Sequence, residues 1–463
     1  MSETQQYDVA VIGAGLAGLS AARRLHEAGL DVIVLEARDR VGGRTLSVTE
    51  DGGRLVEYGG QWVGPTQDHV LALIDELGLE TFTQFTDGDN LQVTGGDQLR
   101  YQGAIPTGDP VQAADLMDAM VELTTQAMTV DPERPWAHER AVELDGLTVE
   151  TWIAATPYCE GAKRWLRTLT RALFPAEPGE ISLLHALFYI RSGGGLEKMI
   201  GTINSAQERR LTRGSQRLSE GLAGLLSDRV RLQCPVTRID HDADGVIVHH
   251  DQGTVRARRA IVAIPPTLAG RIRYRPAMPG LRDQLTQRMF MGSAMKVTAV
   301  YDTPFWRAAG LSGHMTADSG LVQLTFDQTH PLRDEGVLVA FIDSAATRTA
   351  LQLTPEQRRQ AALDELARAF GEPARHPVAY YEKSWMDEEW SRGCYVGIMT
   401  PGTWSTLGEF LREPVGPVHW AGTETATVWS GYMDGAIRSG EDAADAVLAE
   451  LGSLASTAGA VQQ

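Results

Sequence analysis

Cysteine is scarce in this sequence. Cys159, Cys234 and Cys394 are the only three among 463 residues. Their wide spacing matches neither a disulfide framework nor the paired pattern of a zinc site. The eleven histidines are scattered as well, so we expect no metal site. Low cysteine usage suits a chain that works in a reducing compartment, and we expect the cytoplasm.

Long apolar runs and basic charge are also lacking. No segment reaches the roughly 18 uninterrupted apolar residues of a membrane span, and the N-terminal MSETQQYD has no signal-peptide pattern. Lys and Arg number 42 against 60 Asp and Glu, for a net charge of −18. This balance argues against nucleic acid and anionic membranes as partners. We expect a soluble protein that binds neither.

Glycine is abundant, and its most informative pattern lies near the N-terminus. An apolar run at 8–12 predicts a short buried strand. Gly13, Gly15 and Gly18 follow it as G-x-G-x-x-G at the start of a helical pattern. In such a motif the glycines allow a tight turn, close approach to a pyrophosphate, and close helix–strand packing. The helix N-terminus adds N–H donors and a positive dipole end for phosphates.

The next segment completes a dinucleotide-binding unit. Gly29 ends the helix, 31–35 forms a second strand, and Glu36 closes that strand where a carboxylate would bind ribose hydroxyls. Arg44, beside a double glycine, could offer a forked donor to a pyrophosphate, whereas a solvated basic turn is a fair alternative for Arg38 and Arg40. The unit predicts a bound dinucleotide and leaves NAD and FAD both open.

The remaining chain is long enough for two or three domains. Strands are expected at 230–239, 245–250, 254–258, 260–264, 295–301, 321–326, 337–342 and 378–385, and helices at 66–78, 214–226, 355–370, 432–448 and through most of 80–210. Two interleaved domains are the simplest interpretation. One takes 1–80, 211–290 and 386–452, the other takes 81–210 and 291–385, and 453–463 forms a disordered tail.

Three clusters in the second half could carry chemistry. Lys296 lies in an apolar strand, where burial would lower its pKa; the alternative is an edge lysine that faces solvent. Cys394 is either an inert buried thiol or a thiolate that bonds a flavin methyl carbon. Ser430-Gly431 precedes a helix whose N–H groups could stabilise negative charge on a reduced flavin. Glu424 could bind a ribityl hydroxyl.

To about residue 450 the chain resembles the flavin-dependent amine oxidases, in particular the monoamine oxidase branch. The matching runs are VIGAGLAGLSAARRL, VIVLEARDRVGGRT, YGGQWVGPTQ, WSRGCY and AGTETATVWSGYMDGA, together with Lys296 in its apolar strand. The resemblance implies an α/β fold. In it, a Rossmann-like FAD-binding domain of the GR2 type is interleaved with an α+β substrate domain that contains a mixed sheet.

The resemblance also implies site residues. Lys296, Tyr395 and Tyr432 would be catalytic, the tyrosines as an aromatic sandwich at the flavin face and the lysine through a water at flavin N5. The motifs and the resemblance together predict cofactor contacts for Gly13, Ala14, Gly15, Gly18, Glu36, Arg38, Arg44, Gly60, Gln61, Trp62, Val236, Trp385, Cys394, Gly422, Thr423, Glu424, Tyr432 and Met433. Substrate contacts are implied for Phe174, Ile200, Gln207, Leu324, Tyr395 and Tyr432.

The implied activity is FAD-dependent oxidative deamination of primary amines. Hydride passes to flavin N5, O2 reoxidises the flavin, and aldehyde, ammonia and hydrogen peroxide are released. Mostly apolar pocket positions favour aromatic or aliphatic monoamines. Diamine, polyamine and L-amino-acid oxidases of the same superfamily are alternatives, as is a flavin-binding scaffold without turnover.

Two departures from the family bear on the cofactor and the membrane. Arg392 replaces a glycine of the motif found with covalent flavin, but Cys394 is retained, so we expect a thioether from Cys394 to the flavin 8α carbon. The membrane-anchoring helix of animal monoamine oxidases is missing, which implies a soluble bacterial enzyme. A homodimer is considered.

Overall fold

The N-terminal motif forms the predicted strand, turn, helix and strand. In the computed structural model, which describes residues 5–106 and 108–461, these elements are β1 (Gln5–Ile12), α1 (Leu16–Glu27) and β2 (Val32–Leu35). Gly13 has φ of 103°, a conformation that glycine adopts at low cost. A Cβ at Gly13 would lie 2.8 Å from the carbonyl oxygen of Ala263. Glycine is therefore required by both conformation and space.

The first sheet has eight strands. Its order is β10-β2-β1-β13-β12-β11-β14, with β22 also paired to β13. The further strands are β10 (Val230–Arg231), β11 (Val236–Asp242), β12 (Gly245–His250), β13 (Gly253–Val262), β14 (Arg273–Arg275) and β22 (Val418–Trp420). Along β1, Val9 and Val11 enter one core, and Ala10 and Ile12 enter another. Both faces of the sheet are thus buried, as parallel strands require.

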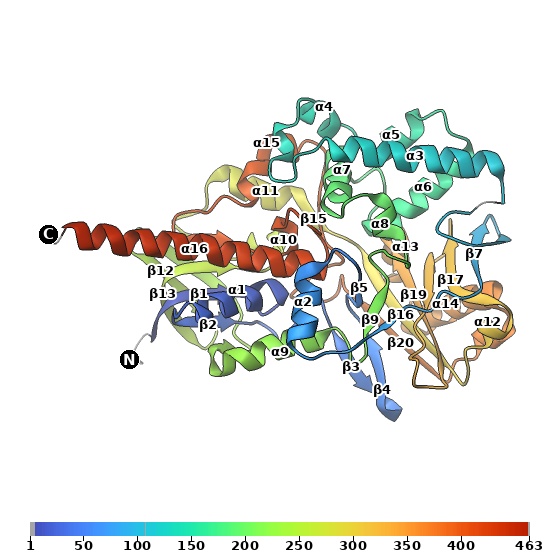
Figure 1. Cartoon of the computed structure of the whole chain (residues 1–463), viewed down its shortest axis with the longest axis horizontal. Helices are drawn as coiled ribbons and strands as arrows, with labels where there is room; N and C mark the ends of the chain where they lie inside the picture. The colour runs from blue at the N-terminus through green and yellow to red at the C-terminus, as the bar shows by residue number, and fades with distance from the viewer. Residues whose placement is uncertain (1–4, 107, 462–463) are drawn as a thin grey trace.

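Helices from both ends of the chain cover one face of this sheet. They are α1, α2 (Asp68–Glu76), α9 (Gln216–Leu226) and α16 (Met433–Val461). Figure 1 shows the C-terminal helix α16 lying along α1. Their backbones come close, because a Cβ on Gly440 would lie 2.0 Å from the carbonyl oxygen of Ala17.

The second sheet has seven strands in the order β20-β16-β19-β18-β17-β7-β8. They are β7 (Asp89–Thr94), β8 (Asp97–Tyr101), β16 (Ala294–Tyr301), β17 (Leu311–Ala317), β18 (Leu324–Asp327), β19 (Gly336–Asp343) and β20 (Ala379–Ser384). The β17–β7 pair is parallel and the others are antiparallel. A mixed sheet is therefore present, and the mixed α/β architecture is confirmed. The domain boundaries remain a prediction.

Helices pack around the second sheet and above the cavity. The sheet is covered by α12 (Phe305–Ala308), α13 (Ser344–Ala350) and α14 (Pro355–Phe370). The helical region consists of α3 (Pro110–Met128), α4 (Ala141–Gly146), α5 (Val149–Ala155), α6 (Glu160–Leu173), α7 (Leu183–Ser192) and α8 (Leu196–Ile200). It shares one core with α11 (Gly280–Arg288) and α15 (Trp404–Leu407).

Small strand groups and one short helix complete the fold. The strands are β3 (Ser47–Glu50) with β4 (Arg54–Glu57), β5 (Trp62–Val63) with β9 (Arg209–Leu211) and β6 (Thr81–Thr83), and β15 (Met289–Met291) with β21 (Gly397–Met399). The helix is α10 (Pro266–Ala269). The β4–β5 connection carries residues 58–61 toward the site.

Three sequence expectations need correction. The strand expected at 230–239 is split into β10 and β11, because Gln233 has a positive φ of 54° and Pro235 lacks an N–H. The strands expected at 254–258 and 260–264 are one strand, β13, whose two halves pair with β12 and β22. The segment 453–461, expected to be disordered, continues α16, since alanine and leucine favour helix. Residues 462–463 lie outside the described residues.

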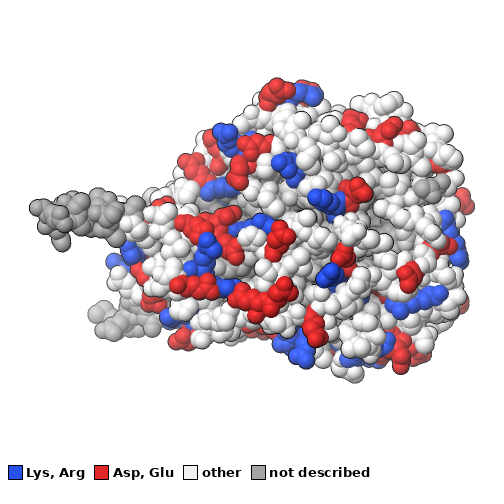
Figure 2. All heavy atoms as spheres, in the orientation of Figure 1, with Lys and Arg blue, Asp and Glu red and all other residues white. Residues whose placement is uncertain are grey.

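The helices of the described residues and the charges on the surface bear on contact with a membrane. Among residues 5–106 and 108–461, no helix combines the length and apolarity needed to cross a membrane. Figure 2 shows acidic and basic side chains interspersed over one face of the molecule. Many such pairs are exposed ion pairs, for example Arg24 with Asp445, and each contributes little to stability.

The close contact of α1 and α16 predicts a selective effect of a small substitution. Gly440→Ala should lower the midpoint of thermal unfolding, because overpacking costs about 1–3 kcal/mol. Gly224→Ala in α9 is the matched control, since a Cβ there meets nothing within 4 Å, and its midpoint should hold or rise. An unchanged midpoint for Gly440→Ala would show that the helices are not in close contact.

Candidate active site

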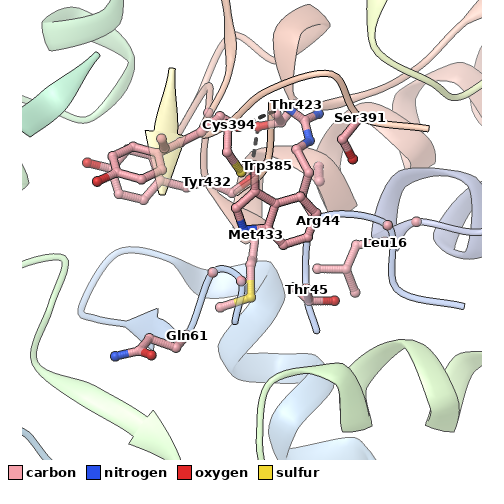
Figure 3. A pocket seen from close by; sticks show the side chains of 18 of the residues that line it. Leu16, Arg44, Thr45, Gln61, Trp385, Ser391, Cys394, Thr423, Tyr432 and Met433 are labelled. Carbon is pink, nitrogen blue, oxygen red and sulfur yellow. Dashed lines mark hydrogen bonds between the residues drawn. The ribbon is translucent and has the colours of Figure 1, made fainter. Parts of the chain in front are cut away.

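One cavity connects the glycine turn of the first sheet to the second sheet. It encloses about 1640 Å³ including its open mouth. Gly13, Gly15 and Glu36 line one end, and Leu324 and Phe341 line the other. Figure 3 shows Arg44, Gln61, Trp385, Cys394, Thr423, Tyr432 and Met433 around the cavity. The wall also includes Arg38, Gly60, Trp62, Lys296, Tyr395 and Gly422. Most of the predicted cofactor residues thus meet in one place.

The glycine end of the cavity fits a dinucleotide. A Cβ on Gly15 would meet nothing within 4 Å, so the backbone at the helix N-terminus is open to a ligand. Glu36 is buried, and its carboxylate accepts the Ala14 N–H at 2.7 Å and the Arg38 N–H at 3.0 Å. This carboxylate both stiffens the turn and lies where a ribose is expected.

Arg44, whose side chain is 20% exposed, forms an ion pair with the buried Glu424. The guanidinium donates from Nη1 to Oε1 at 2.6 Å and from Nη2 to Oε2 at 3.0 Å. Glu424 also accepts the N–H of Gly397, and Arg44 Nη1 also donates to the carbonyl of Tyr395. Burial raises the pKa of Glu424, but Arg44 outweighs it and the net pKa is lowered. Both side chains are therefore charged and paired.

This pairing changes what the two residues offer a ligand. Glu424 is not among the described residues that line the cavity, and its oxygens are already used by Arg44 and Gly397. The contact expected between Glu424 and a ribityl hydroxyl is not supported by this placement. Arg44 does line the cavity, but both terminal nitrogens of its guanidinium donate to the Glu424 carboxylate.

Trp385 and Cys394 form the wall next to this ion pair. Figure 3 shows the two side chains next to each other, and they pack with Ala294 and Tyr395 in one small cluster. The indole of Trp385 donates to the carbonyl of Tyr58 at 2.8 Å, which fixes the ring. Burial raises the pKa of the Cys394 thiol to about 12, with Arg44 opposing the increase. The Cys394 thiol is therefore protonated at neutral pH.

The two predicted tyrosines both line the cavity. The Tyr395 hydroxyl donates to Asp343 Oδ2 at 3.2 Å. Tyr432 precedes α16, and its ring lies 4.8 Å from that of Trp429 and 6.1 Å from that of Tyr189. Each tyrosine is held by its own partners, so both rings have fixed positions.

Lys296 is buried rather than exposed at an edge. Its Nζ donates to the carbonyl of Gly59 at 3.0 Å and to Gln61 Oε1. Burial lowers the pKa of Lys296 to about 7, and the nearby Glu57 carboxylate opposes the decrease. The lysine can therefore change protonation state near neutral pH at the cavity wall.

The predicted substrate residues divide into two groups. Gln207 and Leu324 line the cavity. Phe174 and Ile200 pack in the helical core instead, with Phe174 4.8 Å from the ring of Tyr189. Helix α6 ends at Leu173, so Leu173 reaches the cavity while the next residue turns into the core.

Three predicted cofactor residues also lie outside the described cavity wall. They are Ala14, Gly18 and Val236. Gly18 has a packing role, since a Cβ there would lie 2.0 Å from the carbonyl oxygen of Gly13. Val236 lies in β11.

The sequence did not reveal several residues of the site. Tyr189, Phe326 and Phe341 line the cavity, but in sequence they look like any buried helix or strand residue. Asp343, which binds Tyr395, follows the strand predicted at 337–342. A carboxylate directly after a buried strand was the signal that could have identified it.

Comparison with known proteins identifies the family. A family model described as flavin containing amine oxidoreductase matches residues 16–448. The chain belongs to this family. A probable flavin-containing monoamine oxidase A of Dictyostelium discoideum is 41% identical over 438 residues, which cover 94% of this chain and 96% of the relative. A putative flavin-containing monoamine oxidase of Mycobacterium tuberculosis is 40% identical over 444 residues, which cover 96% and 97%.

Solved structures of amine oxidases share the fold. Cyclohexylamine oxidase from Brevibacterium oxydans superposes with a TM-score of 0.93 at 36% identity, covering 96% of this chain and 99% of that one. Putrescine oxidase bound to putrescine gives 0.92 at 36% identity, covering 96% and 100%. The family, the fold and these relatives confirm the resemblance: the chain is an FAD-dependent amine oxidase.

The ion pair makes this amine oxidase sensitive to a change at one carboxylate. Glu424→Gln should lower stability at neutral pH by about 1–3 kcal/mol, because the mostly buried Arg44 loses its counter-charge. A lowered folded-state pKa means that the carboxylate stabilises above its unfolded pKa and that this stabilisation is lost as pH falls through the folded value. The thermal midpoints of variant and wild type should therefore converge in acid.

A surface pair provides the control for that measurement. Arg140 and Glu143 form an exposed ion pair, so Glu143→Gln should leave the midpoint nearly unchanged at either pH. Equal midpoints for Glu424→Gln and wild type at neutral pH would contradict a stabilising role for the pair of Arg44 and Glu424.

Proposed function

We propose that this amine oxidase deaminates aromatic or aliphatic primary monoamines, with O2 as the electron acceptor, and releases aldehyde, ammonia and hydrogen peroxide. The preference for monoamines is inferred from the low number of acidic residues in the cavity wall. Leu173, Leu324, Phe326 and Phe341 supply apolar surface at the far end, and Glu36, at the glycine end, is the single acidic residue among the described residues of the wall. The second ammonium of a diamine would be buried there without a counter-charge, which is costly.

The side chains then act mainly by positioning. Bound FAD supplies the acceptor for the hydride that leaves the amine carbon. The faces of Tyr395 and Tyr432 attract an approaching cation and guide the neutral amine, whose lone pair supports loss of hydride. The apolar wall excludes water, and fixed geometry accounts for most of the rate. A side-chain general base is not required.

We further propose that Cys394 would hold the flavin through a thioether to its 8α carbon. The S–C bond would replace the S–H bond of the thiol and one C–H bond of the methyl group, and the two electrons and two protons released would pass to O2, the acceptor of the proposed reaction. The thiol lies in the cavity wall against Trp385 and Tyr395. Burial raises the pKa of the thiol, and the positive charges of Arg44 and Lys296 only partly oppose this increase, so the support for the bond is the position of Cys394 in the wall. A variant of putrescine oxidase described as a redesign of cofactor binding carries an alanine-to-cysteine substitution. This chain has a cysteine in its cavity without redesign.

Diamines and L-amino acids are the two alternative substrate classes, and different observations bear on each. A diamine is favoured by the likeness to putrescine oxidase and disfavoured by the apolar wall. An L-amino acid needs a free arginine for its carboxylate, but the arginines of the described wall, Arg38 and Arg44, already bind Glu388 and Glu424. A cytoplasmic location and a homodimer complete the proposal, the location resting on the low cysteine content.

Steady-state assays of peroxide release test the substrate class. Benzylamine, phenethylamine or hexylamine should have a kcat/KM at least about 10-fold above that of putrescine. A difference of this size is expected when one substrate leaves a polar group unsatisfied in an apolar pocket. Leu324→Glu places a carboxylate in the far wall. It should lower the ratio of kcat/KM for the monoamines to kcat/KM for putrescine. A wild-type preference for putrescine would contradict the proposal.

Acid denaturation tests the covalent bond. Precipitated wild-type protein should remain yellow, whereas Cys394→Ala should release its flavin into the supernatant. Cys234→Ala, at a buried thiol in the core of the first sheet, is the matched control and should keep the flavin. Release from wild type, or retention by Cys394→Ala, would refute the thioether.

A further inference from the structure

Gln61 holds an unusual position in the cavity wall. Its side chain is 1% exposed, and its Oε1 accepts two hydrogen bonds, from Lys296 Nζ and from Gln328 Nε2, the latter at 3.0 Å. Its Nε2 has no hydrogen-bond partner among the described residues. Gln61 lines the cavity, and Figure 3 shows its amide at the opposite side of the cavity from Cys394.

The two donors fix which end of the amide is free. Lys296 and the Gln328 NH2 both require an acceptor, so they select the carbonyl end of Gln61. Gln328 is held in turn, because its own main-chain carbonyl accepts from the buried Arg210 at 3.0 Å. The NH2 of Gln61 is therefore left unpaired, and a buried amide donor is normally satisfied.

The backbone next to Gln61 is fixed as well. Ser215 Oγ donates to the carbonyl of Gly60, and the carboxylate of Glu57 accepts the N–H of Ser215 at 2.6 Å. Lys296 binds the carbonyl of Gly59. The segment 57–61 thus cannot turn Gln61 away from the cavity without breaking several buried hydrogen bonds.

We propose that Gln61 is a positioning residue: its carbonyl holds the Nζ of Lys296 at the cavity wall, and its free NH2 donates to an acceptor atom of the bound flavin. This role rests on the proposal that the cavity holds the flavin. Flavin ring oxygens and N5 are the acceptors that such a donor can meet. Lysine and amide would then form a pair of donors with a fixed spacing.

Other charges also face Lys296 and enter its pH dependence. Glu57 from β4, Arg210 from β9 and Cys394 act on it electrostatically. On the neighbouring strand β20, Lys383 is paired in register with Lys296, and its ammonium binds Glu388 at 2.8 Å. A change at Gln61 alone must therefore be compared with variants that leave these groups in place.

Three variants of the flavin-loaded protein separate the two ends of the amide. Gln61→Met removes both functions, so the pKa of Lys296 should fall by about one unit, since the charged lysine loses an acceptor. The charge of Lys296 acts on the flavin beside it, so this change should appear as an equal fall in the pH midpoint of flavin reoxidation. Gln61→Glu keeps the acceptor and adds negative charge, so the midpoint should rise by about one unit. Both lack the donor, so both should shift the visible absorption of the bound flavin. Lys296→Met should remove this pH dependence of flavin reoxidation.

Gln67→Met is the matched control. Gln67 is fully buried near the start of α2 and is not among the described residues of the cavity wall, so its midpoint and spectrum should equal those of wild type. Flavin-loaded Gln61 variants with wild-type midpoint and spectrum would overturn the inference alone. A wild-type protein that binds no flavin would overturn the inference together with the proposed function.

Discussion

The ion pair between Arg44 and the buried Glu424 is the interaction on which the site depends. It joins the segment after the N-terminal glycine motif to the segment before the last helix, 380 positions along the chain. Two charges inside a protein are tolerated only when both are well paired. Here the carboxylate also binds Gly397, and the guanidinium also binds the carbonyl of Tyr395. The pair therefore sets the distance between the dinucleotide end and the aromatic wall.

Around this pair, the cavity is assembled from separate pieces of chain. The first sheet supplies the glycine turn, β4–β5 supplies Gln61, β16 supplies Lys296, and the chain before α16 supplies Tyr432. Close backbone contacts, such as that of α1 with α16, hold the first and last parts of the chain together (Figure 1). The pyrophosphate end is local in sequence, whereas the reactive end exists only after folding.

Local sequence patterns made the pyrophosphate end of the cavity predictable, whereas the reactive end could be described only from the structure. The strand, glycine turn and helix at 8–27 follow from short-range rules, and so does the cluster before α16. The exposure of Lys296 could not be decided, because an edge strand and a buried strand have the same apolar pattern. The misplacement of Phe174 and Ile200 reflects where α6 and α8 end, which tertiary packing sets. The pairing of Arg44 with Glu424 left no signal in either motif.

We infer that this cavity holds a flavin that amines reduce directly. Anaerobic rapid mixing of the purified holoenzyme with benzylamine tests it most directly. Bleaching of the oxidised-flavin absorbance in a single turnover, at a rate no slower than kcat and strongly reduced in a Tyr395→Ala, Tyr432→Ala double variant, is the expected result. A flavin that stays oxidised with every amine, or that bleaches equally fast without the two tyrosines, would contradict the claim.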